Sequence, residues 1–286
     1  MERVSVLTLV HNRTGHLRNV LRGLAMSPHR PAEVIVIVMG GEDPRPHLEP
    51  GPLVVEYVFL KEQERMPLAA ARNRAAHQSQ NEFLIFLDVD CLPGPQLVWA
   101  YTDALAQHQA LCVGEVRYLP HAARTHSLDF DSLKSVARAH SARWVPPTKD
   151  PWTRTRSYEL FWSLSFAVRK SVLGKLGGFD EGYVGYGGED TDLAFTARKL
   201  GVPLVWVRDA LALHQYHEKS DPPLDHFDDI IANARRFHSK WNAWPMDGWL
   251  RAYAAMDLIT WTPNCEAINV MRPPTNQEVE EARVTS

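Results

Sequence analysis

The sequence predicts an α/β fold, with a mostly parallel sheet flanked by helices and a helical extension at the C-terminal end. Apolar runs rich in β-branched residues, such as 4–10 and 34–38, are typical of strands buried on both faces. Segments with a helical period separate these runs, and this alternation is typical of βαβ units. After Pro222 the pattern becomes helical only, which indicates an extension beyond the sheet.

The expected elements follow one another along the chain. Thr14 is expected to cap the helix after the first strand, and Pro28 to end it. Further strands are expected at 34–38, 53–60, 83–87, 112–119, 162–168 and 203–207, and further helices from Pro67 to residue 80, from Pro93 to residue 108, and over 190–200. The segment 121–157 lacks clear periodicity, and we interpret it as a mobile lid or a substrate-binding insertion.

The last part of the chain has two sections. Apolar residues of 222–256 follow the 3.6-residue period, so residues 219–272 are expected to form the helical extension. Its apolar face is expected to cover the sheet, with dimer formation or docking to a partner as the alternative. Residues 273–286 are polar and lack a core face, and they are expected to be disordered.

Composition excludes several classes of protein. The chain has 286 residues, of which 45% are hydrophobic, and its net charge of −3 gives no basic field for nucleic acid. Three cysteines without paired spacing argue against a disulfide framework. We find no apolar stretch of roughly 18 residues and no signal-peptide pattern. A cytoplasmic protein is therefore expected, while peripheral membrane association and a homodimer stay open.

One acidic cluster, Asp88-Val89-Asp90, follows the apolar run 83–87 directly. In a strand, side chains at i and i+2 share a face, so Asp88 and Asp90 are expected to project together from the strand end. Open α/β sheets bind ligands at that edge. A D-x-D pair is a weak signal alone, but its place after a buried strand favours metal or nucleotide binding over a solvated turn.

A second acidic cluster opens the helix at 190–200. Acids in a first helical turn complement the helix dipole, and this alone could explain Glu189, Asp190 and Asp192. It does not explain the glycine-rich segment 182–188 before them, which permits close approach of the backbone to a ligand. An ionised carboxylate there can accept a proton from an attacking hydroxyl.

Other polar and aromatic residues carry weaker signals. His214 and His217 follow the strand expected at 203–207, and imidazole with carboxylate and phosphate oxygens suits Mn²⁺, with Mg²⁺ as the alternative. Arg72 could contact a nucleotide or belong to a solvated helix face. Trp162 could belong to the core or form a floor for a sugar.

Together these segments resemble nucleotide-sugar glycosyltransferases of the GT-A fold, of the family-2 type. The second half is similar to the C-terminal segment of β-1,4-galactosyltransferases and polypeptide N-acetylgalactosaminyltransferases. The resemblance runs from Val4 to about His217. It is carried by Val4-Ser5-Val6 to Asn12-Arg13, Ala71-Arg72-Asn73, Phe86 to Pro93, and Gly177-Gly178-Phe179-Asp180-Glu181 through Gly187-Gly188-Glu189-Asp190-Thr191-Asp192-Leu193.

The resemblance implies roles for individual residues. Asp90 and His214 would hold the metal, Asp190 would be the general base, and Glu189 would hold the acceptor or donor sugar. The remaining residues implied in nucleotide-sugar binding are Val10, Asn12, Arg13, Arg72, Asp88, Val89, Trp162, Gly187 and Gly188. It also implies a domain at 1–218, with a nucleotide-binding half at 1–120 and an acceptor-binding, catalytic half at 121–218.

The implied activity is metal-dependent, inverting transfer of a hexose or N-acetylhexosamine from a nucleotide diphosphate sugar to a hydroxyl of a glycan or small molecule. A UDP-sugar is the expected donor. The chain departs from the family at Met39-Gly40-Gly41, where an Asp pair that reads uracil is usual, so the base stays open. The alternatives are a non-catalytic nucleotide-sugar-binding protein and a sugar-1-phosphate nucleotidyltransferase.

Overall fold

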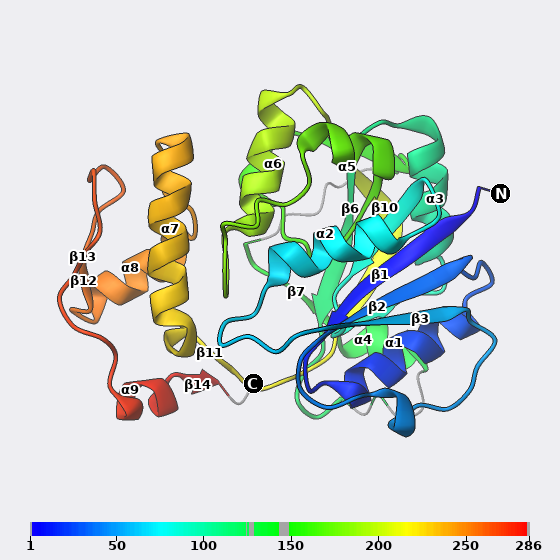
Figure 1. Ribbon diagram of the computed structural model, residues 1–286, viewed down its shortest axis with the longest axis horizontal. Coiled ribbons are helices and arrows are strands. Elements are labelled where there is room, and N and C mark those ends of the chain that lie inside the picture. The colour runs from blue at the N-terminus through cyan, green and yellow to red at the C-terminus, as the bar shows by residue number, and fades with distance from the viewer. Residues whose placement is uncertain (1, 124, 126–128, 143–148, 285–286) are drawn as a thin grey trace.

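A computed structural model of the chain describes residues 2–123, 125, 129–142 and 149–284. It has the expected α/β architecture, with a mostly parallel central sheet between helices (Figure 1). From residue 219 onwards the chain forms a smaller lobe beside this domain. Among the described residues, no helix combines the length and the hydrophobicity needed to cross a bilayer.

The main path of the central sheet has the strand order β3-β2-β1-β4-β9-β6-β10-β5. Strands β1 to β4 are parallel to one another, and β6 is parallel to β10, whereas β9 runs antiparallel between β4 and β6. The strands are β1 (Val4–Val10), β2 (Glu33–Met39), β3 (Val55–Leu60), β4 (Phe83–Leu87), β5 (Cys91–Pro93), β6 (Leu111–Tyr118), β9 (Ser165–Arg169) and β10 (Leu204–His214), with the short β7 (Arg138–Ala139) on β6 and β8 (Trp152–Thr155) on β10.

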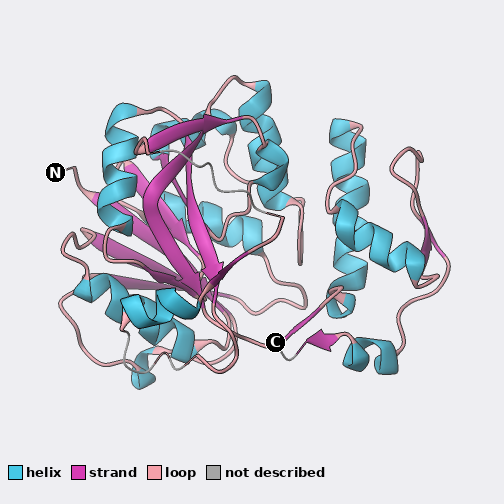
Figure 2. Cartoon of the chain, turned by 180° about the vertical axis from the view of Figure 1, so that it is seen from behind, coloured by secondary structure: helices cyan, strands magenta, loops and turns pink. Residues whose placement is uncertain are grey.

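Two layers of helices cover the sheet, and each buries one apolar face against it (Figure 2). On one side lie α1 (Thr14–Met26) and α3 (Leu97–Gln107). On the other lie α2 (Leu68–Gln78), α5 (Lys170–Leu176) and α6 (Glu189–Lys199). Strands β1, β2 and β4 are buried on both faces, which explains their near-continuous hydrophobicity, whereas β3 at the edge of the sheet is only partly buried.

The expected elements are confirmed in kind, and the differences lie at their ends. Thr14 is the first residue of α1 rather than its cap, because Asn12 turns the chain at φ 51° and leaves Arg13 in the cap position without a side-chain bond. The helix expected from Pro93 begins later, at Leu97. Residues 91–93 instead pair antiparallel with the end of β10.

The segment 121–157 contains more structure than its composition predicts. Asp129 caps a short helix, α4 (Phe130–Val136), by accepting a bond from the Ser132 backbone N–H. Strands β7 and β8 add to the sheet edge. Positions 124, 126–128 and 143–148 lie outside the described residues, so the interpretation as a mobile lid stays a prediction.

The C-terminal lobe has a hydrophobic core of its own rather than covering the sheet, which corrects the expected packing. Its core side chains, among them Ile230, Leu250 and Trp261, come from several elements of the lobe. These elements are β11 (Lys219–Ser220), the 3-10 turn Leu224–His226, α7 (Phe227–Trp241), α8 (Asp247–Ala255), β12 (Ile259–Thr260), β13 (Asn269–Val270), α9 (Asn276–Glu281) and β14 (Arg283–Val284).

The prediction of a disordered tail is wrong for residues 273–284. Thr275 and Glu278 form a capping box at the start of α9, and Arg272 binds both carboxylate oxygens of Glu278 at 2.7 and 2.8 Å. Strand β14 then pairs with β11 at the beginning of the lobe. The capping box and the Arg272 pair are polar, and the pairing of β14 with β11 joins distant segments, so neither produces an apolar period in the sequence.

Candidate active site

The polar residues expected at the edge of the sheet meet there. Strands β1, β4 and β10 point in the same direction, so their carboxyl ends share one edge. Asp90 follows β4 and His214 ends β10. A backbone hydrogen bond links the two strand ends: the N–H of Gln215 donates to the carbonyl of Asp90 at 2.6 Å.

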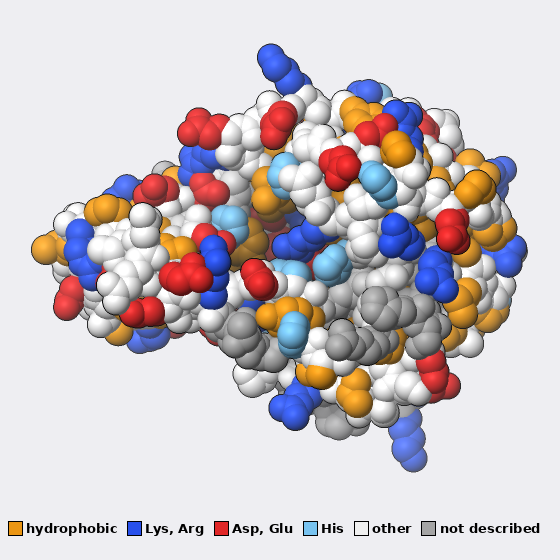
Figure 3. All heavy atoms as spheres, turned by 90° about the horizontal axis from the view of Figure 1, so that it is seen from below, with side chains coloured by type: hydrophobic (Ala, Val, Ile, Leu, Met, Phe, Trp, Pro, Cys, Tyr) orange, Lys and Arg blue, Asp and Glu red, His pale blue; other side chains and the backbone are white. Residues whose placement is uncertain are grey.

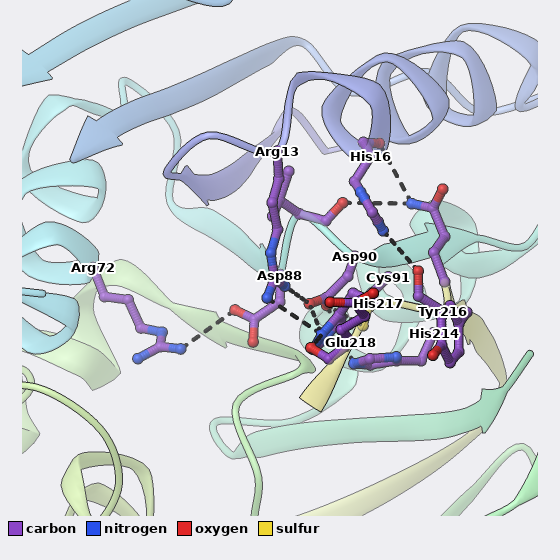
Figure 4. A network of polar contacts seen from close by, with 12 residues as sticks. Arg13, His16, Arg72, Asp88, Asp90, Cys91, His214, Tyr216, His217 and Glu218 are labelled. Carbon is purple, nitrogen blue, oxygen red and sulfur yellow. Dashed lines mark hydrogen bonds and ion pairs between the residues drawn. The ribbon is translucent and has the colours of Figure 1, made fainter. Parts of the chain in front are cut away.

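Asp90, His214 and His217 form a cluster that could hold a metal ion (Figure 4). One ligand atom from each lies within 4.8 Å of the others. The Nε2 atoms of His214 and His217 lie 3.5 and 3.4 Å from the two oxygens of Asp90. A carboxylate with two imidazoles is a donor set suited to Mn²⁺ more than to Mg²⁺, which prefers oxygen ligands alone.

The protonation states of this cluster also suit a cation. Burial alone would raise the pKa of Asp90, but the charges and hydrogen bonds of His214, His217 and Arg13 outweigh it and lower the pKa. Burial lowers the pKa of His214, against the attraction of Asp90. An ionised carboxylate beside a neutral imidazole is the state in which both bind metals.

Arg13 lies directly over this cluster. Its Nη1 donates to Asp90 Oδ2 at 2.7 Å, and its Nη2 is 3.3 Å from His217 Nδ1. The resemblance predicted that Arg13 contacts the nucleotide sugar, and the structure brings it to the carboxylate that was expected to hold the metal. Because more than a third of its side chain is exposed, it can also reach an anionic ligand in front of the cluster.

On the other side of the strand end, Arg72 joins the two acidic clusters. This arginine of α2 is buried, and its Nη1 donates to Glu189 Oε1 at 2.9 Å while its Nη2 lies 3.3 Å from Asp88 Oδ1. The alternative of a solvated helix face is therefore wrong for Arg72. Asp88 and Glu189, which are 101 positions apart in sequence, are thus held together by one guanidinium.

Burial shifts the pKa of both carboxylates that Arg72 contacts. It raises the pKa of Asp88 to about 7, with Arg72 opposing the change. It also raises the pKa of Glu189, an effect to which the charge of Asp190 adds and which Arg72 opposes. Glu189 Oε2 is buried and has no hydrogen-bond partner among the described residues, so one acceptor atom of this group is unused.

Asp190 has the surroundings expected of a base. Its Oδ1 accepts from the Thr191 backbone N–H at 2.6 Å and its Oδ2 from the Ser163 N–H at 3.3 Å, which fixes the carboxylate plane. Burial raises its pKa, with Arg72 opposing the change. A carboxylate whose pKa is raised is a stronger base than an exposed aspartate.

The glycines before α6 allow this helix to begin where it does. Gly187 and Gly188 have φ values of 90° and 94°, a region that side chains with a Cβ rarely adopt. A Cβ at Gly188 would also lie 3.2 Å from the ring of Tyr183. These residues therefore give the sharp turn that presents Glu189 and Asp190 at the start of the helix.

The remaining predicted residues lie around this site in different ways. Val10 and Val89 are buried in the core, so their side chains are not exposed to a ligand. Asn12 accepts the N–H of Glu42 at 3.1 Å and thereby joins the ends of β1 and β2. Trp162 precedes β9 rather than lying within it, and it is half-buried next to Ser163.

A row of rings connects Trp162 with the histidine cluster. Tyr118 stacks on His214 with centroids 4.7 Å apart, and His140 lies between Tyr118 and Trp162 at 5.5 and 4.9 Å. No sequence pattern predicts this row, because its members come from four separate segments. In Figure 3, histidine, basic and acidic side chains gather in a hollow between the large domain and the C-terminal lobe.

A family model described as "Glycosyltransferase like family 2" matches residues 53–208, more than half of the chain. The chain belongs to this family. It is also similar to validoxylamine A glucosyltransferase of Streptomyces hygroscopicus subsp. limoneus, with 28% identity over 83% of this chain and 56% of the relative. The chain spans about half the length of the curated validoxylamine A glucosyltransferases that it matches.

Solved structures share the fold. The crystal structure of GalNAc-T7 with UDP, GalNAc and Mn²⁺ aligns with a TM-score of 0.62 and 15% identity, over 89% of this chain and 57% of that one. The mannosyltransferase PcManGT from Pyrobaculum calidifontis, in complex with GDP-Man and Mn²⁺, aligns with a TM-score of 0.52 and 19% identity, over 90% and 70%. The expected GT-A fold is confirmed, while the special likeness of the C-terminal segment stays a prediction.

Proposed function

We propose that this chain transfers a hexose or N-acetylhexosamine from a nucleotide diphosphate sugar to a hydroxyl group, with inversion at the anomeric carbon. The observation that carries the proposal is the meeting of two groups at one sheet edge. One is the cluster of Asp90, His214 and His217, and the other is the pair Glu189 and Asp190, which Arg72 links to Asp88 after β4. Membership of the glycosyltransferase-like family favours sugar transfer over nucleotidyl transfer.

The histidine cluster would hold a divalent cation, Mn²⁺ before Mg²⁺. Such a cation supplies positive charge beside the diphosphate as the sugar leaves. Arg13 lies against the same carboxylate and would bind a diphosphate oxygen through its guanidinium. The two solved neighbours that contain Mn²⁺ also contain a nucleotide or nucleotide sugar, which supports this assignment of the cofactor.

Asp190 would act as the general base. The acceptor oxygen forms its bond to the anomeric carbon, the bond to the diphosphate breaks with its electron pair, and the hydroxyl proton passes to Asp190. Attack opposite the leaving group gives inversion. Glu189, held by Arg72, keeps one buried oxygen available to accept a hydroxyl of the sugar.

The donor is proposed to be a UDP-sugar and the acceptor a glycan or small molecule. Solved neighbours bind UDP, UDP-GlcNAc or GDP-Man, so uridine is favoured without excluding guanosine. The named activity of the curated relative, glucosyl transfer to validoxylamine A, makes UDP-glucose and a small polyhydroxylated acceptor the first pair to examine.

The test is the Asp190→Asn variant, assayed for nucleoside diphosphate release with UDP-sugars, Mn²⁺ and an acceptor panel. Transfer should fall by at least about 100-fold while calorimetry shows unchanged UDP affinity, because only the proton acceptor is lost. A loss of UDP affinity of similar size would contradict the base assignment. Binding without turnover by the unmodified chain would favour the non-catalytic alternative.

A further inference from the structure

The C-terminal lobe places aromatic side chains beside the acidic end of α6. Tyr186 stacks on His226 with ring centroids 4.5 Å apart and planes inclined by 15°. Trp249 of α8 lies against the same tyrosine, with centroids 5.7 Å apart and planes inclined by 32°. Tyr186 is 38% exposed, so these three rings form an open surface, here termed the aromatic platform, rather than closed core.

Gly187 lies between the aromatic platform and α6, the helix that carries Asp190. A Cβ at Gly187 would lie 2.7 Å from Met246 Sδ and 3.7 Å from Trp249 Cζ3, so the lobe packs directly against this residue. Only Gly188 and Glu189 separate it from Asp190 along the chain. The platform therefore lies where the lobe packs against the domain, four residues or fewer before the proposed base along the chain at Tyr186 and Gly187.

Helix α7 of the lobe fixes the orientation of Tyr186. The side-chain amide of Asn233 donates to the carbonyls of Val184 and Tyr186 at 3.1 and 3.2 Å. The carboxylate of Asp229 accepts the backbone N–H of Tyr186 at 3.1 Å. The lobe thus supplies two of the three rings and also holds the third in place.

The nearby acidic residues act on the hydroxyl of Tyr186 through their charge. Burial of this hydroxyl, followed by the charges of Glu189, Asp190 and Asp90, raises its pKa. A neutral phenol within the field of these carboxylates can donate a hydrogen bond but bears no charge at neutral pH. Tyr186 therefore combines an exposed ring with a neutral hydroxyl that can donate a hydrogen bond.

We propose that the aromatic platform of Tyr186, His226 and Trp249 is the acceptor subsite and takes a polyhydroxylated ring, either a sugar or a cyclitol. Such a ring has a face of C–H bonds that packs on aromatic surfaces and a rim of hydroxyls that hydrogen-bond. One rim hydroxyl then faces Asp190. This assignment rests on the proposed glycosyl transfer and adds to it the residues that hold the acceptor ring.

The experiment measures saturation transfer by NMR from the protein, with UDP and Mn²⁺ bound, to two cyclic compounds and one acyclic polyol. The probes are myo-inositol, methyl β-D-glucopyranoside and D-glucitol. The unmodified chain should saturate both rings more strongly than D-glucitol. Trp249→Ala should weaken apparent ring affinity about tenfold, and Trp249→Phe should recover most of it, because a smaller aromatic face remains.

Arg251→Ala is the matched control, since Arg251 is an exposed residue of α8 paired with Asp247. It should leave ring saturation and UDP affinity unchanged. Two outcomes would overturn the acceptor assignment alone if the protein still binds UDP in the presence of Mn²⁺. One is equal saturation of D-glucitol and the two ring compounds. The other is equal affinity of Trp249→Ala and the unmodified protein for the ring compounds. Absence of Mn²⁺-dependent UDP binding by the unmodified chain would overturn the proposed function as well.

Discussion

The indole N–H of Trp241 donates to Asp192 Oδ1 across 2.6 Å, and so joins the last turn of α7 to the first turn of α6. Asp192 is buried and also accepts bonds from Tyr183 and Lys240. It lies two residues after Asp190, so the lobe is bonded to the helix that carries the proposed base. Asp192 thus anchors the lobe to α6, in addition to complementing the helix dipole.

Replacing Trp241 by Phe should lower the free energy of unfolding by about 1–3 kcal/mol, since a buried carboxylate loses a charge-assisted bond. Urea unfolding measures the change. Lys199→Ala is the control, because Lys199 is exposed and contacts the same ring from outside; its effect should stay under about 0.5 kcal/mol. Equal stability of Trp241→Phe and the unmodified chain would show that the bond anchors nothing.

Glu189→Gln should make the protein more stable at neutral pH and inactive. Burial raises the folded-state pKa of Glu189 above its ordinary value of 4.5, so the folded state disfavours the charged form. The associated stability is fully present below the unfolded-state pKa and is lost as pH rises through the folded-state pKa. Urea midpoints of the two proteins should therefore agree near about pH 4 and diverge toward about pH 8. A variant less stable at both pH values would contradict this.

The raised pKa of Asp190 predicts a displaced acid limb in the activity profile. A base must be ionised to accept a proton, so kcat/KM should fall as pH decreases through a pKa above the ordinary 3.8 of aspartate. The profile is measured at saturating Mn²⁺, to separate this limb from metal loss. A constant kcat/KM down to the ordinary aspartate value would contradict the assignment of Asp190 as base.

His217 should matter for metal binding as much as His214. Both imidazoles approach Asp90 within 3.5 Å, so His214→Ala and His217→Ala should each weaken Mn²⁺ binding by at least about tenfold in calorimetry. His77→Ala, which changes an exposed residue of α2, is the control. Retention of full Mn²⁺ affinity in His217→Ala would reduce the site to Asp90 and His214.

The sequence predicts the fold well where local pattern and global packing agree. Strand β4 is buried on both faces, so its five apolar residues place Asp88 and Asp90 at the sheet edge without further information. The contact of Arg13 with His217 spans 204 positions and depends on the tertiary fold, so no spacing reveals it. The buried pairs of Arg72 are hidden for the same reason, since an arginine on a helix is usually solvated.

The C-terminal lobe shows the limit of periodicity. The pattern of α7 correctly predicts an apolar face, but it does not say whether that face meets the sheet or other parts of the lobe. The stacking of Tyr186 on His226 likewise requires a turn whose geometry depends on positive φ at the neighbouring glycines. Local signals therefore identify the elements, and tertiary contacts decide which of them share a site.

The most direct measurement is nucleoside diphosphate release from UDP-sugars by chelator-treated protein, before and after addition of Mn²⁺, with Asp90→Ala in parallel. We expect release only after Mn²⁺ is added, and none from a folded Asp90→Ala variant, because Asp90 is the carboxylate shared by both histidines and Arg13. Equal release without any divalent cation, or full Mn²⁺-dependent release by Asp90→Ala, would contradict the account.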